Sequence, residues 1–154
     1  MKAAYVEVEK AVQKKLKLHY DIPGDDYTRA GEASAALKQV LRQLGFSASV
    51  IRRVVIATYE GEINMVIHAN GGTIDAEIDS VCVSLVLSDT GPGIPEIDRA
   101  MQEGYSTASE DARSLGFGAG MGLPNMRKHS DYMKIESEPG VGTKVYMKIS
   151  ISVE

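Results

Sequence analysis

The chain has 154 residues, of which 44% are hydrophobic and 25% are charged, so we expect residues 1–154 to form one globular domain. The net charge of −4 disfavours a nucleic-acid partner, because a duplex binder needs a basic face and the lysines and arginines here are scattered. One cysteine, Cys82, excludes a disulfide framework, and no apolar stretch has the length of a membrane span, so we expect a soluble cytoplasmic protein.

The first third of the chain predicts a strand and a helix. Residues 16–22 alternate apolar and polar side chains and then meet a Pro-Gly pair, which indicates a strand that enters a turn. The preceding residues 1–13 fit either a strand or a helix. Residues 27–44 carry apolar side chains near the helical period, and Gly45 marks the end of this predicted helix.

A second helix, capped by Ser47 or Ser49, is predicted to run to about residue 69. It carries three polar residues that recur every four positions and therefore lie one turn apart on one stripe: Glu60, Asn64 and His68. A carboxylate, an amide and an imidazole in register resemble a base, a metal ligand and a positioning group, which favours a lined cavity over solvent. A core helix with incidental polar residues is the alternative.

Two neighbours of the stripe predict packing rather than chemistry. Gly61 is unfavourable inside a helix, so it indicates close approach of another part of the protein. Glu62 lies about 200° around the helix from Glu60, which predicts a structural role for its carboxylate.

The middle of the chain predicts a hairpin of strands at 73–79 and 81–88, joined at Asp79 and Ser80. The second strand is rich in β-branched and apolar residues, which favours a central place in a sheet. Asp89 and the glycines that come after it follow directly at the C-terminal end of this strand. A short helix at about 95–103 comes next.

The last third of the chain contains a long segment without periodicity, residues 104–120, and a loop of that length inside a compact domain is usually functional. A helix at about 121–129 and strands at 131–137 and 143–151 follow. The order of elements predicts an α+β domain, a two-layer sandwich in which helices cover one face of a mostly antiparallel mixed sheet.

The glycine-rich residues 116–122 stand directly before a predicted helix, so they can cradle phosphate with backbone N–H groups. They lack the glycine spacing of the dinucleotide fingerprint and the Gly-Lys-Ser/Thr of the Walker loop, and a flexible loop is the alternative. Asp89-Thr90-Gly91 also occurs around aspartic-protease carboxylates. Pro92 and the long helices over 27–69 argue against that activity.

Taken in order, these segments resemble the Bergerat-fold ATP-binding domains of gyrase-type ATPases, Hsp90-like chaperones, histidine kinases and anti-sigma-factor kinases. The resemblance rests on four boxes, with the spacing Glu60-x-x-x-Asn64-x-x-x-His68, Asp89-x-Gly91-x-Gly93, Gly118-x-Gly120-x-Gly122 and Gly142-Thr143. It covers residues 60–143 and implies a bound ATP or ADP. In this fold residues 104–120 correspond to the ATP lid.

Within that superfamily, the chain is similar to the stand-alone bacterial anti-sigma and switch-protein serine/threonine kinases. The motifs that carry this similarity are residues 89–95, 103–107 and 118–124. The resemblance implies a kinase that uses ATP and Mg²⁺ to phosphorylate a small antagonist protein of the anti-anti-sigma type. It also allows a sigma factor as a partner and a homodimer. The alternative is a non-catalytic module whose binding to a sigma factor depends on nucleotide.

The resemblance also implies roles for single residues. Asn64 would coordinate Mg²⁺ and Glu60 would act as the general base, while Asp89 would accept the exocyclic amine of adenine. Arg113, the single arginine of the loop, would reach the γ-phosphate. The further nucleotide-binding residues implied in this way are His68, Gly91, Gly93, Ile94, Gly116, Gly118, Gly120, Met121, Gly122, Leu123 and Thr143.

Overall fold

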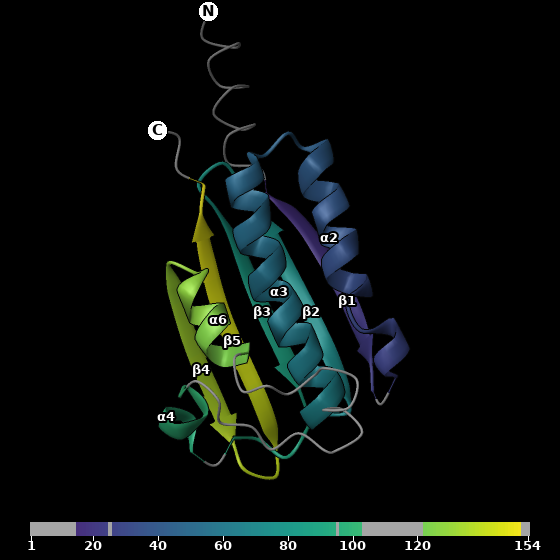
Figure 1. Cartoon of the computed structure of the whole chain (residues 1–154), viewed down its shortest axis with the longest axis vertical. Helices are drawn as coiled ribbons and strands as arrows, with labels where there is room; N and C mark the ends of the chain where they lie inside the picture. The colour runs from purple at the N-terminus through teal and green to yellow at the C-terminus, as the bar shows by residue number, and fades with distance from the viewer. Residues whose placement is uncertain (1–14, 25, 95, 103–121, 152–154) are drawn as a thin grey trace, which may run out of the picture.

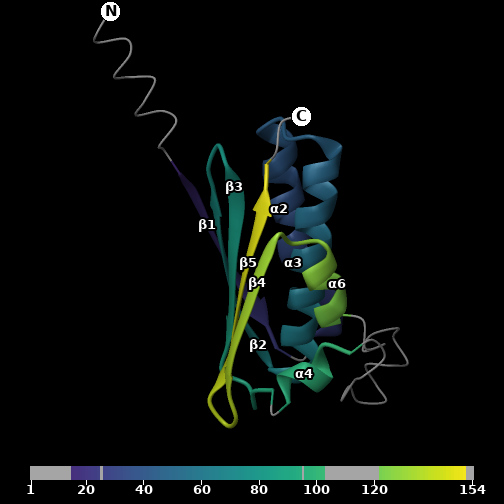
Figure 2. The ribbon, with the colours of Figure 1, turned by 90° about the vertical axis from the view of Figure 1, so that its left-hand side faces the viewer.

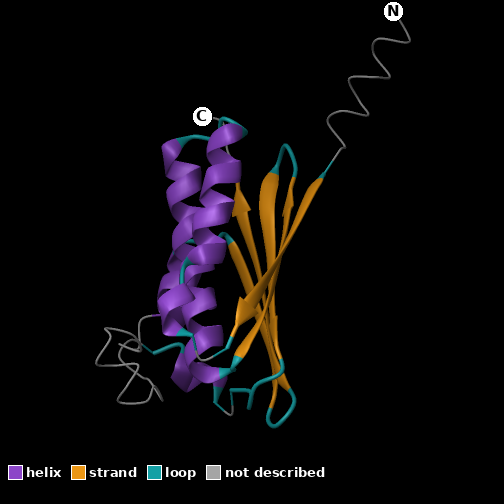
Figure 3. Ribbon diagram, turned by 90° about the vertical axis from the view of Figure 1, so that its right-hand side faces the viewer, coloured by secondary structure: helices purple, strands orange, loops and turns teal. Residues whose placement is uncertain are grey.

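The computed structural model describes residues 15–24, 26–94, 96–102 and 122–151, and these residues form two layers (Figure 1). One layer is a five-stranded sheet, and the helices of the described residues lie against one of its faces (Figures 2 and 3). Each strand pairing in the described residues is antiparallel. The predicted α+β two-layer class is therefore confirmed, with an antiparallel sheet rather than a mixed one.

The elements follow one another as β1 (Leu16–Pro23), the short 3-10 helix η1 (Tyr27–Arg29), α2 (Glu32–Gln43), α3 (Ala48–His68), β2 (Gly71–Ile78), β3 (Cys82–Asp89), α4 (Ile97–Ala100), α6 (Gly122–Lys128), β4 (Tyr132–Glu138) and β5 (Gly142–Ser150). The strands are ordered β1-β2-β3-β5-β4 across the sheet, so β3 is central as predicted. None of the described helices is long and apolar enough to cross a membrane.

The predicted helix over 27–44 is wrong in its first turns. Its beginning is the separate helix η1, and α2 starts only after Gly31, whose φ of 102° breaks the helical path. The reason lies on another helix: the Glu62 carboxylate accepts hydrogen bonds from the backbone N–H groups of Gly31, Ala33 and Ser34 at 2.9–3.0 Å. Glu62 thus supplies the N-terminal cap of α2 and is only 1% exposed, which confirms its structural role.

The helix α3 begins as predicted, because the Ser47 hydroxyl accepts a hydrogen bond from the N–H of Val50. The helix predicted over 95–103 is shorter in the structure, where α4 covers Ile97–Ala100. After α4 the chain forms a turn, in which the N–H of Gln102 donates a hydrogen bond to the carbonyl oxygen of Arg99. Residues 1–13 and the predicted lid at 104–120 lie outside the described residues.

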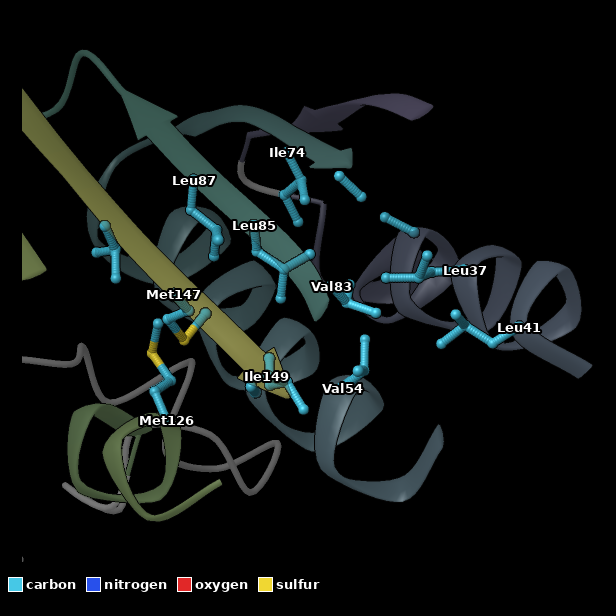
Figure 4. Packing of buried hydrophobic residues seen from close by; sticks show 14 of the residues in the cluster. Leu37, Leu41, Val54, Ile74, Val83, Leu85, Leu87, Met126, Met147 and Ile149 are labelled. Atoms are coloured by element: carbon cyan, nitrogen blue, oxygen red, sulfur yellow. The ribbon is translucent and has the colours of Figure 1, made fainter. Parts of the chain in front are cut away.

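The core lies between the sheet and the helices (Figure 4). In the strands, every second residue points inward and contributes to the core, and in the helices the apolar stripes do. The residues labelled in Figure 4 are Leu37, Leu41, Val54, Ile74, Val83, Leu85, Leu87, Met126, Met147 and Ile149. A Cβ atom on Gly61 would collide with the side chain of Leu87 and would lie 3.3 Å from Cε of Met126. The close approach predicted at Gly61 is therefore the packing of α3 on β3 and α6.

Candidate functional site

A cavity of about 390 Å³ lies between the C-terminal half of α3, the N-terminus of α6 and the end of the sheet where β3 finishes. Eight of the site residues predicted from the sequence line it: Asn64, His68, Asp89, Gly93, Ile94, Gly122, Leu123 and Thr143. Each of the four predicted boxes therefore contributes to one cavity, although these residues are spread over 80 positions of the chain, from Asn64 to Thr143.

The stripe on α3 divides between the cavity and its border. Asn64 and His68 line the cavity, whereas Glu60, one turn earlier, is half-buried beside it and is not part of its lining. The Glu60 carboxylate accepts a hydrogen bond from the side-chain amide of Asn125 at 2.8 Å. Gly122 lies against the Asn64 amide, because a Cβ atom there would be 3.1 Å from Asn64 Oδ1.

Burial changes the titration of the histidine in this stripe. His68 is partly enclosed by the cavity wall, and this desolvation lowers the pKa of its imidazole below the ordinary value of 6.5. The neutral imidazole is therefore the dominant form at neutral pH, which makes His68 a polar wall residue rather than a cation.

Asp89 is the last residue of β3, and it lines the cavity. Burial raises the pKa of this carboxyl above its ordinary value, and hydrogen bonds from the backbone of Gly91 and Thr143 oppose the rise. The bond from Gly91 N–H to Asp89 Oδ1 measures 3.0 Å. A carboxylate has about four acceptor positions, so Asp89 retains capacity to accept an N–H donor from a ligand in the cavity.

The loop after Asp89 is held against the turn between β4 and β5. Gly93 has a φ of 80°, and a Cβ atom there would lie 2.6 Å from the carbonyl oxygen of Glu138, so only glycine fits. The N–H of Ile94 donates to the Ser137 hydroxyl at 2.6 Å, and that hydroxyl also contacts Thr143 Oγ1 at 2.9 Å. Ser137 thus connects the residue that follows the box Asp89-x-Gly91-x-Gly93 to Thr143 of the box Gly142-Thr143.

Sequence reasoning missed two residues beside the cavity, Ser137 and Asn125. Ser137 carries a faint signal, because it shares the inward face of β4 with Met133 and Ile135 and is polar where they are apolar. Asn125 carries no such signal, since its partner Glu60 is 65 positions away in the chain.

Some predicted site residues fall outside the described part of the chain, namely Arg113, Gly116, Gly118, Gly120 and Met121. Among the residues that are described, no group of three or more His, Cys, Asp or Glu side chains could hold a metal ion. The cavity wall offers a cation the side-chain oxygen of Asn64, a hard donor of the kind that suits Mg²⁺ when it keeps waters and substrate phosphates.

Comparison with known proteins identifies the family. Residues 35–153 match the model of the histidine kinase-, DNA gyrase B- and HSP90-like ATPases. The serine/threonine-protein kinase RsbT of Bacillus subtilis is 30% identical over 112 residues, covering 70% of this chain and 78% of that protein. The anti-sigma F factor of Clostridium beijerinckii is 32% identical over 127 residues, covering 79% and 85%. That of Halalkalibacterium halodurans is 33% identical, covering 66% and 62%.

Solved structures show the same fold. A Mycobacterium tuberculosis structure that contains RsbU and RsbW domains has a TM-score of 0.60 and 18% identity, covering 90% of this chain and 33% of the other. The SiaB-SiaC complex of Pseudomonas aeruginosa has a TM-score of 0.59 and 14% identity, covering 96% of this chain and 97% of the other.

Proposed function

Because this chain belongs to the family of histidine kinase-, DNA gyrase B- and HSP90-like ATPases, we propose that it is an ATP-dependent serine/threonine kinase of a bacterial partner-switching module. Its substrate is a small antagonist protein of the anti-anti-sigma type, which accepts phosphate on a serine or threonine. The names of two relatives, a serine/threonine-protein kinase and an anti-sigma F factor, support this assignment.

The cavity fits a nucleotide by its chemistry. Asp89 offers a partly buried acceptor to the exocyclic amine of adenine. Gly91 and Gly93 let the loop after Asp89 pack closely, because a Cβ atom would meet Ala69 at Gly91 and the Glu138 backbone at Gly93. At the other end, Gly122 brings the N-terminus of α6 against the Asn64 amide. This is where residues of the chain would hold phosphates and Mg²⁺.

ATP supplies the transferable phosphoryl group, and Mg²⁺ offsets the negative charge of the phosphates. The chain contributes position and a proton acceptor. Glu60 is the general base: its carboxylate receives the proton of the attacking hydroxyl as the serine or threonine oxygen becomes a nucleophile. The observation that carries the proposal is that Glu60 stands one turn before Asn64 on helix α3, beside the cavity that Asn64 lines.

A second function has support from the relatives that are named anti-sigma F factors. In that function the chain binds a sigma factor in a nucleotide-dependent way, with or without phosphotransfer. The two functions predict different consequences for one substitution. Loss of Glu60 as a proton acceptor removes phosphotransfer, whereas sigma-factor binding depends on the surface and the bound nucleotide.

The test is phosphate incorporation from γ-labelled ATP and Mg²⁺ into each small antagonist-domain protein encoded beside the gene. Wild type is compared with Glu60→Gln, which keeps the shape of the side chain, and with Glu77→Gln, a matched control on the open face of the sheet. We expect Glu60→Gln to bind ATP normally and to transfer phosphate about 10²- to 10⁴-fold more slowly. We expect Glu77→Gln to behave as wild type.

A pull-down with candidate sigma factors, with and without ATP, runs beside this assay. If wild type transfers no phosphate to any antagonist and yet retains a sigma factor when ATP is present, the kinase assignment is wrong and the binding module replaces it. If Glu60→Gln transfers phosphate at the wild-type rate, the base is a different residue.

A further inference from the structure

The helix α6 contacts the α3 stripe at successive positions along its length. Gly122 lies against the Asn64 amide, and Asn125, one turn later on the same face of α6, donates a hydrogen bond to Glu60. Met126, which is fully buried, packs beside Gly61 and anchors α6 in the core. The helix is thereby held so that it touches both polar residues assigned to the chemistry.

We propose that Asn125 is a positioning residue for phosphotransfer. Its side-chain amide holds one oxygen of the Glu60 carboxylate and leaves the other oxygen to accept the proton of the attacking hydroxyl. This inference rests on the proposed kinase function, because it concerns the base of that reaction. Asn125 acts through Glu60 and takes no part in the proton transfer itself.

The chemistry of the two groups determines which atom of Asn125 faces the base. An ionised carboxylate only accepts hydrogen bonds, so its partner at 2.8 Å from Oε2 must be the amide nitrogen and not the amide oxygen. Within the part of the chain that the structure describes, Asn125 supplies the one side-chain donor to this carboxylate. The bond therefore engages Oε2, and among the described residues no side chain donates to Oε1.

The bond matters because a glutamate side chain is otherwise free to adopt several rotamers. Glu60 is half-buried on α3, and its carboxyl group stands three rotatable bonds away from the backbone. A displacement of about 1 Å at a reacting group can cost about 100-fold in rate. Without the amide the carboxylate spends part of its time in rotamers that do not face the hydroxyl.

The competing interpretation is that Asn125 only ties α6 to α3. That role predicts a loss of stability and of nucleotide affinity, and it does not depend on whether residue 60 is an acid. A positioning role predicts a loss in kcat alone, which disappears once Glu60 has been neutralised. A double-mutant cycle separates these two outcomes.

The experiment measures kcat for phosphate transfer, the Kd for ATP by calorimetry and the unfolding temperature. The variants are Asn125→Ala, Asn125→Asp, Glu60→Gln and the double variant Asn125→Ala with Glu60→Gln. Arg127→Ala is the matched control, because Arg127 is an exposed residue of the same helix. Asn125→Ser, which keeps a small polar group, replaces Asn125→Ala if the alanine variant does not fold.

We expect Asn125→Ala to lower kcat about 10- to 100-fold and to keep the Kd for ATP within about twofold of wild type. In the Glu60→Gln background the same change should have no further effect on kcat. Asn125→Asp should lower kcat more than Asn125→Ala, because it sets a second negative charge beside the base. Arg127→Ala should match wild type.

Two results would overturn the inference: an unchanged kcat in Asn125→Ala, or an equal loss in both backgrounds, which would show that the residue only joins the helices. A wild-type protein that transfers no phosphate refutes the proposed function, and the inference falls with it. Transfer by wild type together with full activity of Asn125→Ala refutes the inference alone.

Discussion

Replacement of Asp89 by asparagine tests the nucleotide pocket most directly. In the wild type the carboxylate accepts hydrogen bonds from the backbone of Gly91 and Thr143 and still has acceptor positions for an amine in the cavity. Asparagine keeps the size of the side chain but turns one acceptor oxygen into an N–H₂ donor. That donor then faces either a backbone N–H or the adenine amine, and one of these contacts is lost.

A buried donor left without an acceptor costs about 1–3 kcal/mol. The Kd for ATP and for ADP should therefore rise by about 5- to 150-fold. The two nucleotides should lose affinity equally, since the contact is to the adenine and not to the phosphates. A larger loss for ATP than for ADP would contradict the assignment of Asp89 to the base.

The same substitution should not weaken the fold. Burial raises the pKa of Asp89 above its unfolded value, so the folded state binds more protons than the unfolded state between those two pKa values. The free energy of unfolding accordingly falls as pH rises through this window, and at neutral pH the buried charge is destabilising. We expect Asp89→Asn to unfold at the same temperature as wild type or at a higher one.

Calorimetric titration with ATP and ADP, beside thermal unfolding without nucleotide, measures both effects. Asp75→Asn is the control, because Asp75 lies exposed on β2, on the open face of the sheet. Wild-type affinity in Asp89→Asn would refute the adenine assignment. Weak binding accompanied by a lower unfolding temperature would mean that the variant had lost structure rather than a ligand contact.

Three further substitutions follow from the structure. Asn64→Ala should weaken ATP binding mainly when Mg²⁺ is present. An equal loss of ATP affinity in the presence of Mg²⁺ and in the presence of a chelator would contradict the role of Asn64 as a metal ligand. Glu62→Ala should lower the free energy of unfolding by about 2–4 kcal/mol in urea titrations, because three backbone N–H groups lose their acceptor, whereas Glu77→Ala should change it by less than about 0.5 kcal/mol. Gly93→Ala should reduce nucleotide affinity, because its Cβ atom would collide with Glu138 and displace the loop, and an unchanged Kd would show that the loop tolerates the shift.

Much of the fold followed from local patterns. The alternation in residues 16–22 and the apolar run in 81–88 predicted strands whose bounds in the structure differ by no more than one residue at each end. The packing role of Gly61 followed from the cost of glycine inside a helix, and the structural role of Glu62 followed from the helical period, which turns it about 200° away from Glu60. The four boxes likewise predicted a nucleotide cavity, since their order along the chain resembled that of a known fold.

The tertiary structure decided the contacts between residues that are far apart in the chain. Glu62 caps the beginning of α2 within the region predicted as one helix over 27–44, although it lies 28–31 positions away from the N–H groups that it caps. Ser137 holds Ile94 across 43 positions, and Asn125 holds Glu60 across 65. A sequence pattern reports which face of an element is buried, because periodicity is a local property. It does not report which side chain of another element lies opposite, because that depends on how the helices and the sheet pack together.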